Sequence, residues 1–129
     1  MGTDISGWVE IYDEEDDLWD GVIAASSLMD RDYQIFGILF GVRCQDHFSP
    51  VAPARGIPEN VSPQVEDELK DWQTIVSPSW ITWAEIQIVD WKALEHELWL
   101  EWKLLFDLMN LIAQRYGAGN TRLVVWFDQ

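Results

Sequence analysis

Hydrophobic and polar positions divide the chain into strand-like segments at both ends and helix-like segments between them. Residues 8–12 and 18–23 are rich in β-branched and aromatic side chains, and a run of five acidic residues joins them. This pattern predicts a β-hairpin with an acidic connection. Residues 122–127 are apolar on both faces, which predicts a central strand. We therefore expect the two ends of the chain to meet in one sheet.

Helical spacing begins after the hairpin. Apolar residues recur at helical spacing over 33–40, behind Asp30 or Asp32 as the N-cap, and Gly41 is placed to end this helix. Prolines then predict a long irregular loop over 42–63. Loops of this length inside a compact domain often carry function.

Three further helices are expected in the second half of the chain. Ser62 and Pro63 suit the N-cap and first position of a helix that runs to about residue 72. The segment 77–79 (Ser-Pro-Ser) predicts a break, and residues 82–85 form a capping box, so a helix should begin at Trp83. An apolar stripe between Leu94 and Ile112 predicts a long helix over about 93–116, on which Trp99 and Trp102 should share a face.

These elements predict the fold class. We expect a single α+β domain over residues 1–129, with a small antiparallel or mixed sheet that includes the N-terminal hairpin and the C-terminal strand. Three to four helices, one of them long, should pack on this sheet.

The net charge of the chain limits the classes of partner that the protein can bind. The 129 residues include 23 Asp and Glu against 8 Lys and Arg, for a net charge of −15, together with nine Trp. This balance excludes non-specific binding to nucleic acid, which needs clustered Lys and Arg, and docking on an anionic membrane. One cysteine, Cys44, excludes an internal disulfide framework and fits a reducing compartment. No targeting or membrane-spanning segment is apparent, so we expect an intracellular protein.

The sequence offers little support for catalysis. Cys44 and His47 are a candidate Cys-His pair, whereas His96 is expected on a solvated face of the long helix. Asp13, Asp16 and Asp17 are candidate Mg²⁺ or Ca²⁺ ligands but lack the pattern of an EF-hand. We assign no catalytic residue, no metal site and no cofactor.

Two candidate binding surfaces follow from the side chains. An anionic ligand could be held by sparse arginines and aromatic walls; the candidate residues are Arg31, Tyr33, Arg43, Arg55, Trp80 and Trp83. Pairing of these arginines with local carboxylates is the simpler alternative. A basic partner could be bound by the acidic hairpin; the candidate residues are Asp13, Glu14, Glu15, Asp16, Asp17 and Trp19.

Six short segments, spread over nearly the whole chain, carry a resemblance. They are MGTDI (1–5), RDYQIFG (31–37), FGVR (40–43), RGIPENVS (55–62), SWITWAE (79–85) and LVVWFD (123–128). In this order they resemble a family of small, largely uncharacterised proteins common in bacteriophages and their hosts, whose members open M-G-T-D-I-H and carry P-R-G-L-P and H-S-H-S-W. The resemblance implies a phage-type context in the bacterial cytoplasm and no particular mechanism.

This chain lacks the histidines of those motifs. Ser6 stands where the family places one, and Val76 and Pro78 stand at the two histidine positions of H-S-H-S-W. In the relatives, three histidines with the residue equivalent to Asp4 would suit a metal or acid–base cluster. Their joint absence implies a scaffold retained for binding; the alternative is that those histidines only bond to the backbone.

We therefore expect a phage-type accessory protein that binds a host protein with a basic surface, for example to counter host defence or by imitating nucleic acid. The alternative is capture of a small anionic ligand such as a nucleotide. An immunity protein and a carboxylate-based metal-dependent hydrolase rank lower, and the oligomeric state stays open.

Overall fold

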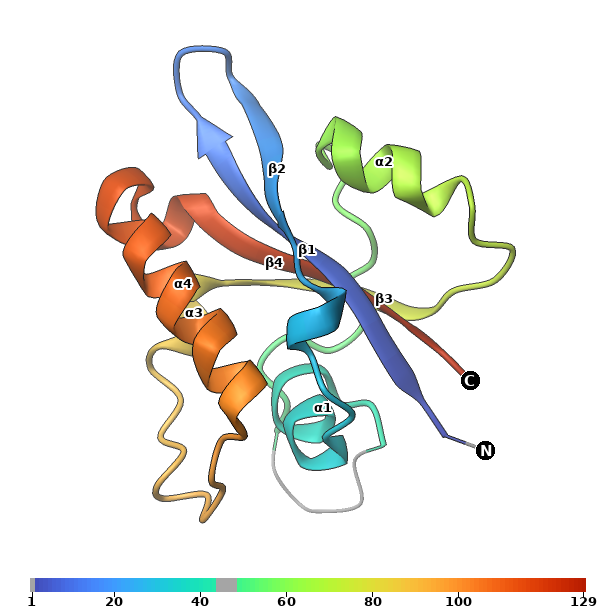
Figure 1. Ribbon diagram of the computed structural model, residues 1–129, viewed down its shortest axis with the longest axis vertical. Helices are drawn as coiled ribbons and strands as arrows, with labels where there is room; N and C mark the ends of the chain where they lie inside the picture. Colours follow the sequence, from blue (N-terminus) through green and yellow to red (C-terminus); the bar gives the residue numbers. More distant parts are fainter. Residues whose placement is uncertain (1, 44–48) are drawn as a thin grey trace.

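The protein forms a four-stranded antiparallel sheet with helices on both faces (Figure 1). The computed structural model describes residues 2–43 and 49–129. The strands are β1 (Asp4–Asp13), β2 (Leu18–Ala24), β3 (Val76–Thr82) and β4 (Thr121–Asp128), and their order across the sheet is β2-β1-β4-β3. The first and last strands pair directly, as predicted, and the α+β fold class is confirmed.

The helices divide between the two faces. They are α1 (Tyr33–Phe40), α2 (Pro63–Leu69), α3 (Trp83–Ile86) and α4 (Leu100–Tyr116), with short 3-10 turns η1 (Ser26–Leu28) and η2 (Ala118–Asn120). Helices α1, α3 and α4 share the main core with one face of the sheet, whereas α2 packs in a second cluster on the other face. No helix in the described parts of the chain is long and apolar enough to cross a membrane.

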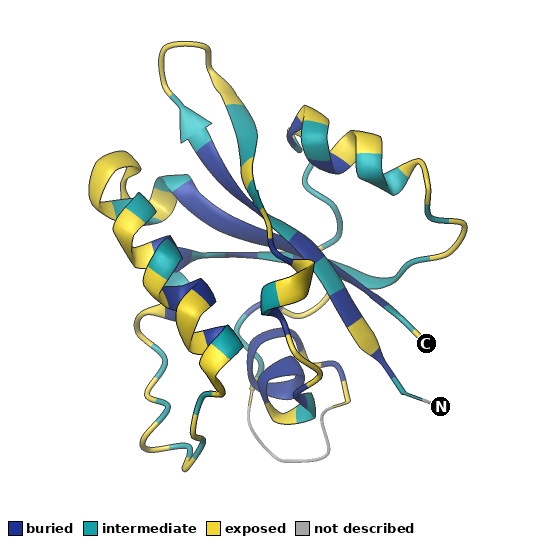
Figure 2. Cartoon of the chain, in the orientation of Figure 1, coloured by how far each residue is buried: buried dark blue, intermediate teal, exposed yellow. Residues whose placement is uncertain are grey.

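Strand β4 separates the two cores. Leu123, Val125 and Phe127 face the main core, while Val124 and Trp126 face the cluster beneath α2. Figure 2 shows β4 buried along most of its length, and the prediction of a central strand is confirmed. Burial of each such side chain stabilises the fold by about 1.5–3 kcal/mol before the loss of chain entropy is counted.

Local signals correctly placed the starts of α1, α2 and α3 and the end of α1. The Asp32 carboxylate accepts hydrogen bonds from the backbone amides of residues 34 and 35 at the start of α1. Gly41 ends that helix with a φ of 69°. The Ser62 hydroxyl accepts the Val65 amide at the start of α2. Thr82 and Glu85 form the predicted capping box of α3. Each cap satisfies amides that the helix itself leaves without a partner.

The predicted break at 77–79 is wrong, because this segment belongs to β3. The strand lies at the edge of the sheet, and its register shifts between Val76 and Ser79. An edge strand tolerates Pro78, since one side of its backbone needs no ladder hydrogen bond. The buried Ser79 hydroxyl donates to the Ala52 carbonyl at 2.6 Å and ties the strand to the preceding loop.

The long helix is shorter than predicted, and His96 is not on it. Helix α4 begins at Leu100, with Trp99 as its N-cap, and Glu95 within the predicted helix adopts a φ of 54°, which helical geometry does not allow. The prediction of a solvated His96 is wrong: its side chain is 8% exposed, with Nε2 3.0 Å from Asp32 Oδ2 and Nδ1 2.8 Å from Gln34 Oε1. This contact holds residues 87–99 against the start of α1. Helix α2 ends at Leu69, three residues before the predicted end.

Candidate functional site

Two of the predicted arginines gather at the start of β1. Arg31 pairs with Asp4 at 2.8 Å, and the Arg43 Nε donates to the Thr3 hydroxyl at 2.9 Å. The Arg43 guanidinium also lies 4.8 Å from the centre of the Tyr33 ring, and the Tyr33 hydroxyl accepts the Thr3 amide. These side chains therefore fix the N-terminal end of the sheet.

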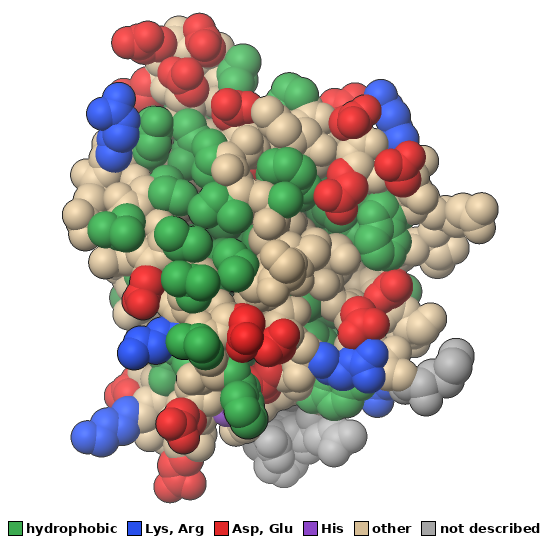
Figure 3. Space-filling model, viewed as in Figure 1, with side chains coloured by type: hydrophobic (Ala, Val, Ile, Leu, Met, Phe, Trp, Pro, Cys, Tyr) green, Lys and Arg blue, Asp and Glu red, His purple; other side chains and the backbone are tan. Residues whose placement is uncertain are grey.

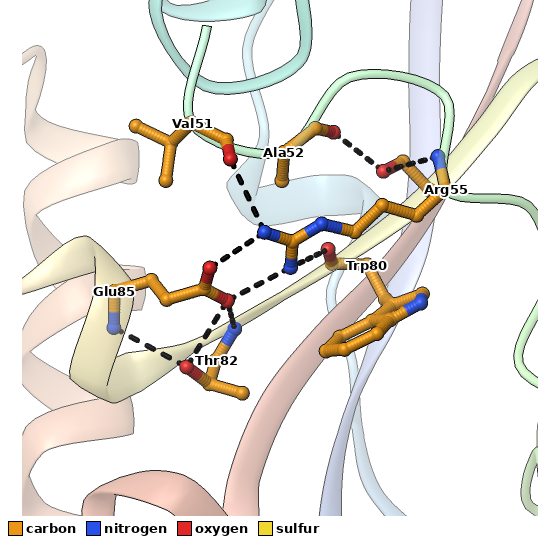
Figure 4. Close-up of polar contacts among 7 residues, drawn as sticks. Val51, Ala52, Arg55, Trp80, Thr82 and Glu85 are labelled. Carbon is orange, nitrogen blue, oxygen red and sulfur yellow. Dashed lines mark hydrogen bonds and ion pairs between the residues drawn. The ribbon is translucent and has the colours of Figure 1, made fainter.

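Arg55 lies at a different place, against β3 and α3 (Figure 4). It forms a bidentate pair with Glu85, at 2.8 and 2.6 Å, and donates to the carbonyls of Val51 and Trp80. Its guanidinium also lies 4.6 Å from the centre of the Trp80 ring. The hydrogen bond with Glu85 raises the pKa of Arg55, and the same bond lowers the pKa of Glu85. The expected alternative of local pairing thus describes both Arg31 and Arg55.

The two tryptophans of the predicted pocket do not share a wall. Trp80 packs with the cluster beneath α2, whereas Trp83 lies in the main core, with its ring centre 6.0 Å from that of Phe106. The predicted ligand-binding set is therefore divided between the start of β1, the Arg55 site and a core position.

The acidic connection forms an exposed turn at the tip of the hairpin. One Asp13 oxygen accepts the amides of Glu15 and Asp16, at 2.9 and 3.3 Å, and the Tyr12 hydroxyl bonds to Asp17. This hydrogen bond, followed by burial and the neighbouring negative charges, raises the pKa of Tyr12. The carboxylates of residues 14–17 face solvent. The tip is an ordered turn that presents negative charge outward.

This turn lies against the C-terminal end of α4. A groove of about 450 Å³ separates them, lined by Tyr12, Asp13, Glu14, Glu15, Arg115 and Tyr116. The groove therefore combines two phenol rings with three carboxylates and one guanidinium. The predicted acidic residues thus form one wall of a groove whose other wall comes from the far end of the chain.

An exposed leucine row runs along α4 from this groove. Leu100, Leu104 and Leu111 are 75%, 45% and 62% exposed, at spacings that place them on one side of the helix. On β2, Leu18 and Val22 are also exposed. Figure 3 shows hydrophobic side chains along α4 and across toward β2, with Asp and Glu groups above and below them. We call these five residues and the acidic groove the α4–hairpin face.

Sequence reasoning missed this face because it assigned the apolar side of the long helix to packing. Trp102 is fully buried, as a core role requires, but Trp99 is 67% exposed at the residue that precedes α4, so the two do not share a buried face. Helix α4 carries two apolar rows: residues 102, 105 and 109 face the core, and residues 100, 104 and 111 face solvent. The second apolar row was the sequence signal that could have indicated an exposed apolar face.

Trp19, predicted to contact a partner, is occupied within the chain. Its ring centre lies 3.7 Å from the guanidinium of Arg122, and its ring also contacts that of Tyr12. Arg122 is buried and pairs through Nε with Glu10 Oε1 at 2.6 Å. Burial lowers the pKa of Arg122, and the Glu10 charge partly opposes this effect. Arg122 and Glu10, which the sequence did not single out, hold the sheet and Trp19 together.

The structure bears on the candidate metal site but not on the candidate Cys-His pair. Within residues 2–43 and 49–129, no group of three or more His, Cys, Asp or Glu is arranged to hold a metal ion, and this includes Asp13, Asp16 and Asp17. The candidate pair of Cys44 and His47 lies outside the described residues.

The structure places two of the three positions at which the resembled family carries histidines. Ser6 on β1 pairs with Trp126, and Val76 on β3 pairs with Phe127, the next residue of β4. Both positions therefore lie at the same end of the sheet, but on opposite faces: Ser6 shares the face of Trp126, and Val76 packs with Phe127 in the main core. In comparisons with protein-family models, curated proteins and solved structures, no significant match to the chain was found. The resemblance stays a prediction.

Proposed function

We propose that this protein acts by binding a partner protein with a basic surface, and that the α4–hairpin face is the contact surface. The observation that carries the proposal is the exposed leucine row of α4, which leaves Leu100, Leu104 and Leu111 in water on a helix whose opposite side already fills the core. Apolar residues gathered on one exposed surface typically mark protein interaction sites.

Charge complementarity selects the class of partner. The chain carries a net charge of −15, and the acidic turn stands at one end of the leucine row. A second copy of this chain would bring the same charge to the interface, and the repulsion between copies would oppose association. A protein with Lys and Arg around an apolar centre gains both attraction at long range and apolar burial on contact.

The acidic groove gives the interface a defined polar contact. Tyr12 and Tyr116 supply aromatic walls, and the three carboxylates of Asp13, Glu14 and Glu15 outnumber the one guanidinium of the groove, which lies 5.4 Å from the centre of the Tyr116 ring. A Lys or Arg side chain of the partner fits this chemistry, since a cation is attracted to both an aromatic face and a carboxylate. In this interface the exposed leucines would bury apolar surface against the partner, and the groove would fix the orientation of the partner by holding a basic side chain.

The sequence resemblance supports a phage-type setting for this binding. In that setting the partner is a host protein in the bacterial cytoplasm, and blocking a nucleic-acid-binding defence protein by presenting an acidic surface is one form of the activity. A basic toxin neutralised by an immunity protein would satisfy the same surface chemistry.

The test is capture of partners from a bacterial lysate with matched variants. Leu104→Ser with Leu111→Ser removes the apolar centre, and the change of residues 13–17 to Asn and Gln removes the acidic turn. Ile88→Ser is the matched control, because Ile88 is 78% exposed outside this face. We expect a captured basic protein to be lost with the leucine variant and retained with the control. With the neutralised hairpin, its binding should weaken and become less sensitive to salt.

Capture that all three variants support equally would contradict the proposal. A leucine-dependent dimer of this chain, detected by light scattering in the absence of any basic partner, would replace it with self-association.

A further inference from the structure

A second hollow lies on the opposite side of β2 from the leucine row. Its volume is about 650 Å³, within the range of small-molecule sites. Its lining comes from β2, β3, β4, the 55–60 loop and η2: Trp19, Arg55, Ile57, Pro58, Glu59, Asn60, Trp80, Thr82, Gly119 and Arg122. Two aromatic rings and several hydrogen-bonding groups thus line one hollow, which the proposed partner interface does not use.

The loop that forms one side of this hollow is anchored at both ends. At its start, the Arg55 amide donates to the Ser79 hydroxyl at 3.2 Å and the Gly56 amide donates to the Pro78 carbonyl at 2.9 Å. At its end, the Ser62 amide donates to Glu10 Oε2 at 2.7 Å. A ligand would therefore meet groups already in place, which reduces the entropic cost of binding.

The two guanidiniums in the hollow are neutralised by the protein itself. Arg55 is paired with Glu85, and Arg122 is paired with Glu10. Each also stacks on a tryptophan, Arg55 on Trp80 and Arg122 on Trp19. A ligand anion would have to compete with these carboxylates and enter a molecule of charge −15, whereas a cationic ligand would meet two guanidiniums.

The remaining chemistry suits a neutral ligand rich in hydroxyl groups. Trp19 and Trp80 each stack on an arginine and are half-buried, so the exposed part of each indole is what can pack against the C–H face of a sugar ring. Glu59 can accept hydrogen bonds and the Asn60 side-chain NH2 can donate them, whereas the Thr82 hydroxyl is already used in the capping box of α3 and the Asn60 Oδ1 accepts from Arg122. A sugar hydroxyl both donates and accepts, so it matches this mixed lining without adding charge. We propose that this hollow is a binding site for a neutral saccharide.

Ligand-observed NMR on the full chain tests the proposal. The probes are maltose, cellobiose, lactose and N,N′-diacetylchitobiose, with adenosine as the neutral planar control and AMP as the anionic control. We expect at least one saccharide to bind, and Trp80→Ala to weaken it ~10-fold through lost ring contact. Trp99→Ala, at an exposed tryptophan outside the hollow, should leave the affinity unchanged.

Trp80 also packs beneath α2, so Glu59→Gln serves as a second variant at an exposed position. It should weaken saccharide binding roughly 3-fold, because a charged acceptor becomes a neutral one. Failure of all four saccharides to bind overturns the proposal, and so does binding of AMP or adenosine alone. The leucine variant of α4 should bind the saccharide normally, so this result is independent of partner binding.

Discussion

Glu10 and Arg122 face each other across β1 and β4, and the Glu10 carboxylate joins three segments of the chain. One oxygen lies 2.6 Å from Arg122 Nε, and the other accepts the Ser62 amide at 2.7 Å. Both side chains are almost fully buried. This pair therefore connects two strands and the end of the loop that borders the second hollow.

Breaking this pair from one side should be costly. Glu10→Gln leaves a buried guanidinium without its counter-charge, and we expect a loss of about 3 kcal/mol in the free energy of unfolding, measured with urea. Glu10→Leu combined with Arg122→Met should cost less than the single change, because neither charge remains buried. Equal losses in the single and double variants would show that the charge pairing itself contributes nothing.

The Arg55–Glu85 pair should make stability fall in acid. Arg55 lowers the pKa of Glu85, so the folded state holds this carboxylate ionised at a pH where the unfolded chain would protonate it. Its contribution is complete above the ordinary glutamate pKa of about 4.3 and is lost as the pH falls through the lowered value. The difference in stability between wild type and Glu85→Gln should therefore shrink below about pH 4.3. A difference independent of pH would contradict this role.

For Asp30 we expect stability to depend on pH in the opposite direction. Its hydrogen bond with Glu101, then burial and the negative charge of Glu101, raise the pKa of Asp30. The favourable contact is present at low pH and is lost as the pH rises through the raised value. Asp30→Asn should therefore raise the melting temperature at pH 7, by calorimetry, and change it less in acid. Asp107→Asn, elsewhere on α4, is the control; an equal gain there would indicate a general relief of negative charge.

The His96–Asp32 contact should control the order of residues 87–99. Asp32 caps α1 with one oxygen and meets His96 with the other. We expect His96→Ala to speed amide exchange in residues 87–99 while the strands stay protected. Asp32→Ala should have this effect and also destabilise α1 by about 1 kcal/mol through the lost cap. Unchanged exchange in residues 87–99 after loss of His96 would show that other contacts hold the segment.

Local patterns predicted the parts of the fold that neighbouring residues determine. Asp32, Ser62 and Thr82 cap helices through contacts a few residues away, so their roles could be recognised in the sequence. Strand β3 depends on pairing with β4, which overrides the local signal of Pro78. The capping box of Thr82 likewise predicted where α3 starts, but not that it would end after one turn.

The candidate sites depended more on distant contacts. Glu10 and Arg122 are 112 residues apart, and nothing in either local sequence announces the pair. The acidic turn was evident from composition, whereas its groove with Tyr116 required the fold. Leu104 and Leu111 lie outside the stripe that predicted the long helix, and a sequence pattern shows that a helix side is apolar but not whether anything covers it.

Site-specific photo-crosslinking in bacterial cells shows whether the α4–hairpin face contacts a basic protein. A photoreactive residue is placed at Leu104, on the α4–hairpin face, and in a matched chain at Ile88, which is exposed elsewhere. We expect adducts with a basic protein from position 104, absent from position 88 and reduced when residues 13–17 are neutralised. The same adducts from both positions, or adducts only between copies of this chain, would contradict this expectation.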